Sequence, residues 1–182
     1  MEWFNPPPEW RAEDDKIYVT SAPNTDFWRK QPEGPYADNG HFYFQKAAGD
    51  FIADVRFTGQ FREQYDQAGL MIRLDEANWV KCGIEFYNEV PHVSAVVTKT
   101  FSDWSIQPLP AAPDDFWLRV TREGAIIEVF YSTDGHEYHL IRQAYLTSEP
   151  LLDIGIMAAA PLGSGFPVVF TGFRLKAPSR SS

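Results

Sequence analysis

Hydrophobic and polar positions follow one another along this chain in short runs, without the 3.6-residue period of an amphipathic helix. The runs are rich in Val, Ile, Phe, Tyr and Trp, and clusters of Gly, Pro, Asn and Asp separate them. Many short strands joined by tight turns are typical of antiparallel meanders in an all-β sandwich or barrel. The pattern predicts strands at Lys16–Ser21, His41–Gln45, Asp50–Thr58, Gln67–Leu74, Val80–Tyr87, His92–Thr100, Phe116–Arg122, Ile126–Ser132, Tyr138–Arg142, Asp153–Ala159 and Val168–Leu175.

Three consecutive strands in the middle of the chain show the clearest alternation, which separates the two faces of a sheet. A four-residue connection over 88–91 would place Tyr87 opposite His92 and Glu85 opposite Ser94. In the preceding hairpin, Glu85 would lie beside Gly69 or Gln67. One parity is apolar and is predicted to face the core: Ala68, Leu70, Ile72, Leu74, Val80, Cys82, Ile84, Phe86, Val93, Ala95 and Val97.

The opposite face of these strands combines charged, small and aromatic residues, and two interpretations of it remain open. In the first, the face is exposed to water and its charges balance one another, as is usual for the polar side of a sandwich. A ligand cleft is favoured by a trough of small residues between aromatic walls, because a ligand approaches small residues closely and flat rings stack on sugars. On the cleft interpretation, Gly83→Leu would fill the trough and leave the fold largely intact. The candidate ligand-binding residues are Asp66, Gln67, Arg73, Lys81, Glu85, His92, Ser94 and Trp104.

Catalytic and metal chemistry are weakly supported by the sequence. Glycoside hydrolysis needs two carboxylates facing one bond, but Glu85 is the only acid on its strand face. Asp66, near the start of the preceding strand, is the candidate for a second acid that reaches it. Trp104 follows the third central strand, as either a stacking platform or an anchor at the rim. The four histidines and the single cysteine show no metal-ligand spacing, so no metal, cofactor or catalytic residue is predicted.

Composition limits the remaining possibilities. The length of 182 residues and an apolar content of 44% suit one domain, expected over residues 1–176 with a flexible tail at 177–182. A net charge of −9 without any basic run argues against nucleic-acid and membrane partners, which require a clustered positive field. Met1–Pro8 lacks the pattern of a signal peptide, and a lone thiol suits a reducing compartment, so a cytoplasmic location is expected.

Several segments together resemble a known family: Glu2–Pro7, Thr25–Arg29, Tyr65–Arg73, Trp79–Phe86 and Phe101–Ser105. They are similar to the uncharacterised family that includes the regulation-of-enolase protein, over essentially the whole chain to Leu175. The resemblance implies the concanavalin A-like lectin/glucanase fold, an antiparallel two-sheet jelly-roll sandwich. It also implies a carbohydrate ligand on the concave sheet face and a regulatory role that touches glycolysis. The acid cluster of the glucanases is missing from this sequence.

Three hypotheses for the function follow. The leading one is a non-catalytic binding or regulatory protein that recognises a small carbohydrate on the mixed face. The second is a carbohydrate-active enzyme that uses Glu85 as acid or base. The third is a regulator that binds a protein partner through the sandwich surface and has no small ligand.

Overall fold

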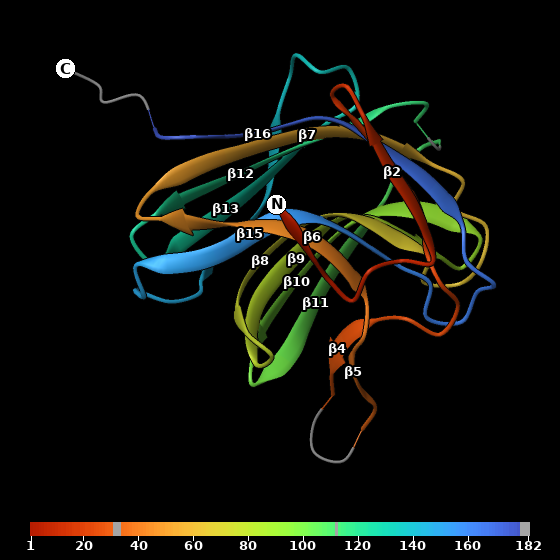
Figure 1. Cartoon of the computed structure of the whole chain (residues 1–182), viewed down its shortest axis with the longest axis horizontal. Helices are drawn as coiled ribbons and strands as arrows, with labels where there is room; N and C mark the ends of the chain where they lie inside the picture. The colour runs from red at the N-terminus through yellow and green to blue at the C-terminus, as the bar shows by residue number, and fades with distance from the viewer. Residues whose placement is uncertain (31–33, 112, 179–182) are drawn as a thin grey trace.

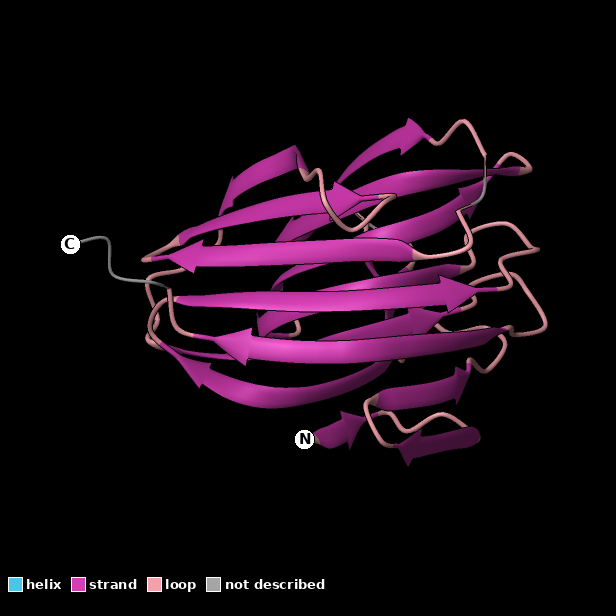
Figure 2. Ribbon diagram, turned by 90° about the horizontal axis from the view of Figure 1, so that it is seen from above, coloured by secondary structure: helices cyan, strands magenta, loops and turns pink. Residues whose placement is uncertain are grey.

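The computed structural model of the chain describes residues 1–30, 34–111 and 113–178, and this part contains strands but no helix (Figures 1 and 2). Within it, two seven-stranded sheets pack face to face, and every pairing between named strands is antiparallel. Sheet A has the order β1 (Glu2–Phe4), β6 (His41–Ala48), β15 (Leu151–Ala159), β8 (Gln67–Asp75), β9 (Asn78–Tyr87), β10 (Val90–Lys99) and β11 (Phe101–Pro108). Sheet B has the order β14 (His139–Tyr145), β13 (Ile126–Ser132), β12 (Phe116–Glu123), β7 (Phe51–Gly59), β16 (Pro167–Lys176), β3 (Lys16–Thr20) and β2 (Glu9–Glu13). A separate hairpin consists of β4 (Phe27–Arg29) and β5 (Tyr36–Asp38).

The predicted all-β, two-sheet antiparallel sandwich is confirmed, and each predicted strand coincides with an observed one. The sequence did not reveal β1, β2, β4, β5 and β11. Of these, β11 has the largest effect on the candidate site, because it carries Trp104. It pairs with β10 from Lys99↔Phe101 to His92↔Pro108. Trp104 therefore lies within an edge strand of sheet A, opposite Val96, and not in a loop beyond the sheet.

The main hydrophobic core lies between the two sheets. Leu70, Ile72 and Val80, all predicted to face it, are completely buried there. Leu74 and Phe86, at the strand ends, are only half-buried. Cys82 also lies in this core, and its burial raises the pKa of the thiol to about 12. The thiol therefore stays protonated and serves as a small apolar side chain.

The predicted register of β9 and β10 is wrong by two residues. Tyr87 pairs with Val90, and Glu85 pairs with His92. The turn contains only Asn88 and Glu89, whose φ angles are 49° and 64°. Two consecutive left-handed residues form the tight hairpin turn that matches the twist of the strands. In the hairpin before it, Glu85 pairs with Gln67, one of the two predicted alternatives.

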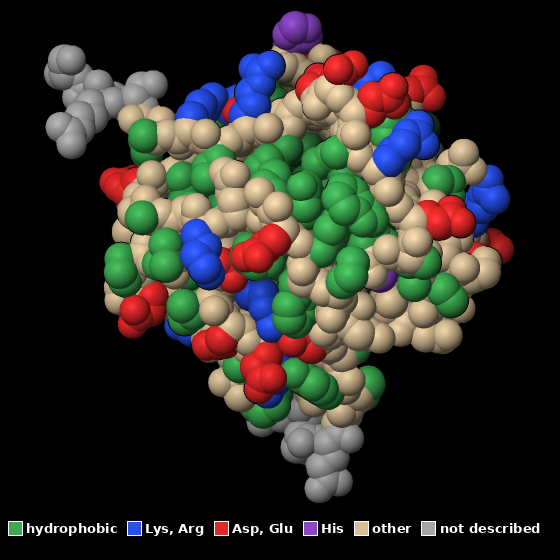
Figure 3. Space-filling view, in the orientation of Figure 1, with side chains coloured by type: hydrophobic (Ala, Val, Ile, Leu, Met, Phe, Trp, Pro, Cys, Tyr) green, Lys and Arg blue, Asp and Glu red, His purple; other side chains and the backbone are tan. Residues whose placement is uncertain are grey.

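The N-terminal strands close one edge of the sandwich. Trp3 on β1 and Trp10 on β2 belong to different sheets, and their ring centroids lie 5.5 Å apart. The Tyr43 ring lies 4.8 Å from Trp3 and 5.6 Å from Trp10. Figure 3 shows a hydrophobic region on this face, around which acidic and basic side chains are intermixed. The aromatic group thus shields the core where the two sheets diverge.

Two further features concern the limits of the chain. Regular structure ends with β16 at Lys176, and most of the predicted tail 177–182 lies outside the described residues. In the described ranges, no helix is long and apolar enough to cross a membrane.

Candidate functional site

The β4–β5 hairpin folds back over the outer face of sheet A, the face opposite the main core (Figure 1). Phe27 of the hairpin is completely buried and packs in a second hydrophobic cluster. Its other buried members come from the strands of sheet A: Phe42, Met71, Trp79, Val96 and Met157. Because the hairpin covers this part of the outer face of sheet A, the interpretation of that face as solvated is wrong. Arg73, Lys81 and Glu85 are only 8%, 4% and 6% exposed.

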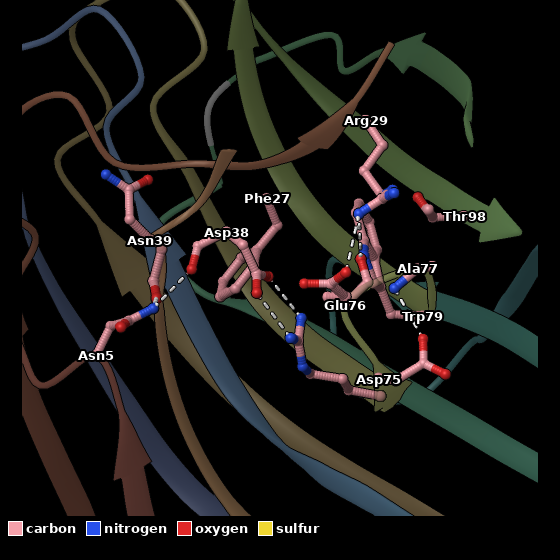
Figure 4. A network of polar contacts seen from close by, with 12 residues as sticks. Asn5, Phe27, Arg29, Asp38, Asn39, Asp75, Glu76, Ala77, Trp79 and Thr98 are labelled. Carbon is pink, nitrogen blue, oxygen red and sulfur yellow. Dashed lines mark hydrogen bonds and ion pairs between the residues drawn. The ribbon is translucent and has the colours of Figure 1, made fainter. Parts of the chain in front are cut away.

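Arg73 holds the second strand of the hairpin. Its guanidinium donates two parallel hydrogen bonds to the Asp38 carboxylate, at 2.7 and 2.8 Å, and lies 4.7 Å from the centre of the Phe4 ring. Asn5 adds a bond from its side-chain amide to the Asp38 backbone oxygen, at 2.9 Å (Figure 4). Arg73 lies six residues along β8 from Gln67, or roughly 20 Å. The structure therefore does not bring Arg73 together with Glu85.

Lys81 holds the segment that leads into β4. Its Nζ donates to Asp26 Oδ1 at 3.0 Å and to the Phe27 carbonyl oxygen at 2.7 Å. Gln67 Nε2 lies 3.3 Å from the same Asp26 oxygen. On the far side of the hairpin, Arg29 Nε donates to the Thr100 carbonyl at 2.8 Å, and its guanidinium faces Glu76 (Figure 4). The hairpin is thus fixed to the sheet at several points.

Glu85, Ser94 and Trp104 form a hydrogen-bonded group next to the covered area. Ser94 Oγ donates to Glu85 Oε2 at 2.7 Å, and Trp104 Nε1 donates to the same oxygen at 2.9 Å. These donors come from β10, which pairs with β9, and from β11, the edge strand beyond it. No hydrogen bond from the described residues reaches the other carboxylate oxygen, Oε1. One oxygen of Glu85 is therefore fixed by the protein, and the other remains available.

A small recess opens beside Glu85, and we call it the Glu85 recess. Its volume of about 10 Å³ accommodates one water-sized group. Four of its lining residues are polar, and the full lining consists of Gln67, Ala68, Lys81, Cys82, Gly83, Ile84, Glu85, Ser94 and Met157. Of the predicted ligand-binding residues, Gln67, Lys81, Glu85 and Ser94 thus meet here.

Glycine is required in the trough because the backbones of two neighbouring strands approach closely there, which the sequence did not reveal. Gly69 and Gly83 pair directly across β8 and β9. A Cβ at Gly83 would overlap the carbonyl oxygen of Ala68, and a Cβ at Gly69 would overlap that of Cys82. The expectation that Gly83→Leu leaves the fold intact is therefore wrong, because the strands approach too closely for any side chain.

Aromatic rings surround the outer side of the Glu85 recess. Tyr87 lies 5.2 Å from Trp104 and 5.7 Å from Tyr65, between ring centroids, and His92 lies 5.7 Å from Tyr87. Trp28 of the hairpin meets Trp104 edge-on at 6.4 Å. The two tyrosines and two tryptophans are half-buried, so parts of their rings remain accessible. Tyr65 lies before β8, where no strand pattern could identify it.

Asp66 does not join this group. It precedes Gln67, and its Oδ2 accepts hydrogen bonds from the backbone N–H groups of Arg62 and Glu63, both at 3.0 Å. Its Oδ1 is buried and has no hydrogen-bond partner among the described residues, and burial raises the pKa of this carboxyl. Asp66 therefore stabilises the loop before β8 and supplies no second carboxylate beside Glu85. In the described residues, no group of three or more His, Cys, Asp or Glu side chains is arranged to hold a metal ion.

Solved structures with low sequence identity share the fold. A GH43 protein from Bacillus licheniformis matches with a TM-score of 0.75 and 16% identity, over 94% of this chain and 35% of that one. A legume lectin-like domain from Entamoeba histolytica matches with a TM-score of 0.63 and 11% identity, over 97% of this chain and 90% of that one. These similarities confirm the predicted concanavalin A-like sandwich and show the fold alone.

Relatives from yeast are much more similar. A functionally unknown protein from Saccharomyces cerevisiae has a crystal structure that matches with a TM-score of 0.94 and 35% identity, over 98% of this chain and 96% of that one. The protein named "Regulation of enolase protein 1" from the same species is 37% identical over 97% of this chain and 89% of its own length. The family described as "Protein of unknown function (DUF1349)" matches residues 3–178. The chain belongs to this DUF1349 family, which includes the regulation-of-enolase protein.

Proposed function

We propose that this protein is a non-catalytic binding module and that the Glu85 recess with its aromatic surround takes a carbohydrate. The observation that carries the proposal is the state of Glu85, a nearly buried carboxylate. Ser94 and Trp104 hold one of its oxygens, and no hydrogen bond from the described part of the chain reaches the other. A sugar ring presents apolar C–H groups to aromatic surfaces and hydroxyl groups to carboxylates. The recess admits one hydroxyl-sized group while the ring of the ligand lies against Trp104 and Tyr87.

Binding is favoured over hydrolysis by the arrangement of the acids. Cleavage of a glycosidic bond needs two carboxylates on either side of it. Asp26 is bound to Lys81, and Asp66 is held by the loop before β8. Neither is free to act with Glu85. The lectin-like fold and the regulatory name of the yeast relative both fit a non-catalytic role.

The competing hypothesis is a regulator that binds a protein partner and no small ligand. The name of the yeast relative supports it, and Trp10, 43% exposed at the closed edge of the sandwich, offers an apolar contact. This hypothesis makes no use of the Glu85 recess, so variants of the recess separate it from the carbohydrate proposal.

A glycan array with matched tryptophan variants tests the proposal. Trp104→Phe keeps a ring but removes the N–H that fixes Glu85, so affinity for a bound glycan should fall about tenfold. Trp117→Phe is the control, because Trp117 lies on β12 in sheet B. Equal binding by the wild type and Trp104→Phe would place the site elsewhere. An array without any bound glycan would contradict the proposal and favour the protein-binding regulator.

A further inference from the structure

The charges around the Glu85 recess do not balance. The charged side chains there are Lys81, Asp26 and Glu85. Lys81 forms an ion pair with Asp26, whereas Glu85 forms none with a described residue. No nitrogen of a described Lys, Arg or His lies within 4.0 Å of the Glu85 carboxylate. His92, its cross-strand neighbour, directs Nδ1 to the Val90 carbonyl oxygen at 2.8 Å. Lys81, Asp26 and Glu85 together, one positive and two negative side chains, leave a formal charge of −1.

Burying an ionised carboxylate such as Glu85 costs free energy unless its charge is compensated. The two groups that bond Glu85, a serine hydroxyl and an indole N–H, are neutral donors. They satisfy one oxygen but supply no positive charge. A fold that needed only a neutral anchor for Ser94 and Trp104 would be served equally by glutamine at position 85. The free oxygen of this 6% exposed carboxylate therefore carries negative charge that no described Lys, Arg or His pairs with.

We infer that the ligand carries a primary ammonium group, which bonds Glu85 Oε1, and that the carbohydrate is an amino sugar. The inference rests on the proposed function and adds the charge of the ligand to it. An ammonium group has the size of a water molecule and fits the recess of about 10 Å³. Trp104 and Tyr87, which are half-buried next to Glu85, would lie beside the sugar ring that carries this group.

The test is calorimetric titration with matched pairs of sugars. D-glucosamine, D-galactosamine and D-mannosamine are compared with D-glucose, D-galactose and D-mannose at a pH of about 6.5, where the amines are charged. At least one amino sugar should bind about tenfold more tightly than its neutral counterpart, because a charge-assisted bond is replaced by a neutral one. Glu85→Gln should remove this preference, and Glu128→Gln on β13 of sheet B is the matched control.

Each result bears on the two proposals differently. Neutral and amino sugars that bind equally well would overturn the ammonium inference and leave the carbohydrate site standing. Cyclohexylamine, a non-sugar amine, is titrated in parallel. If it binds in a Glu85-dependent way and no sugar does, the cation site is supported and the carbohydrate proposal fails. If neither the sugars nor the amine bind, both proposals are overturned. Circular dichroism of Glu85→Gln shows whether the variant keeps its fold.

Discussion

Replacing Gly83 by alanine is expected to lower the free energy of unfolding by about 3 kcal/mol, the upper range for a forced overlap in a packed region. The reason is the close pairing of β8 and β9, in which a new Cβ at this position overlaps the Ala68 carbonyl oxygen. Because Gly69 and Gly83 face each other backbone to backbone, the overlap has no flexible side chain to displace. Urea unfolding followed by circular dichroism measures the change.

Gly49→Ala is the matched control for this experiment. Its φ of 68° is unfavourable for alanine, but a Cβ there meets no atom within 4 Å. The backbone conformation alone should cost about 1 kcal/mol. A Gly83→Ala variant no less stable than Gly49→Ala would show that the two central strands are not as close as described.

Lys81→Met is expected to destabilise the protein by about 3 kcal/mol, since the buried partner of a part-buried ion pair is removed. Methionine keeps most of the length of the side chain but leaves Asp26 Oδ1 and the Phe27 carbonyl oxygen without the ammonium group. The effect should be concentrated in the β4–β5 hairpin, whose amide hydrogens should exchange faster in the variant. Hydrogen exchange read by mass spectrometry, together with urea unfolding, measures both consequences.

The control for Lys81→Met is Lys46→Met. Lys46 also forms an ion pair, with Asp153 at 2.8 Å, but its side chain is 60% exposed. Exposed pairs contribute little, so this variant should unfold like the wild type. A Lys81→Met protein with unchanged stability and hairpin exchange would mean that the hairpin does not depend on Lys81.

The sheet and its core face could be predicted because alternation along the central strands is strong. Leu70, Val80 and Ile84 share one parity with apolar neighbours, so their burial follows from the pattern. The missed strands lack that signal: β2 reads Glu-Trp-Arg-Ala-Glu and is exposed throughout, and β4 and β5 contain three residues each. Such short or polar strands depend on tertiary pairing, which a sequence pattern does not carry.

The candidate site could be predicted only in part, for a related reason. Parity correctly placed Gln67, Lys81, Glu85 and Ser94 on one face, and the structure brings them together in the Glu85 recess. Nothing in the local pattern shows that a distant hairpin covers that face. Arg73 and Lys81 therefore looked like free charges, although their partners are Asp38 and Asp26, 35 and 55 residues away. Non-local partners of this kind become visible only in the folded chain.

The indole N–H signals of the six tryptophans, followed during a titration with D-glucosamine, test the ligand site most directly. Trp104 Nε1 is bonded to Glu85 Oε2, so a ligand that binds Glu85 changes the environment of this proton. Two-dimensional ¹H–¹⁵N spectra of the wild type, with Trp104→Phe for assignment, resolve the signal. We expect the Trp104 signal to shift saturably, while those of Trp10 and Trp117, in sheet B, stay in place. An unchanged Trp104 signal at saturating D-glucosamine, or shifts confined to Trp10 and Trp117, would contradict the assignment of the ligand site to the Glu85 recess.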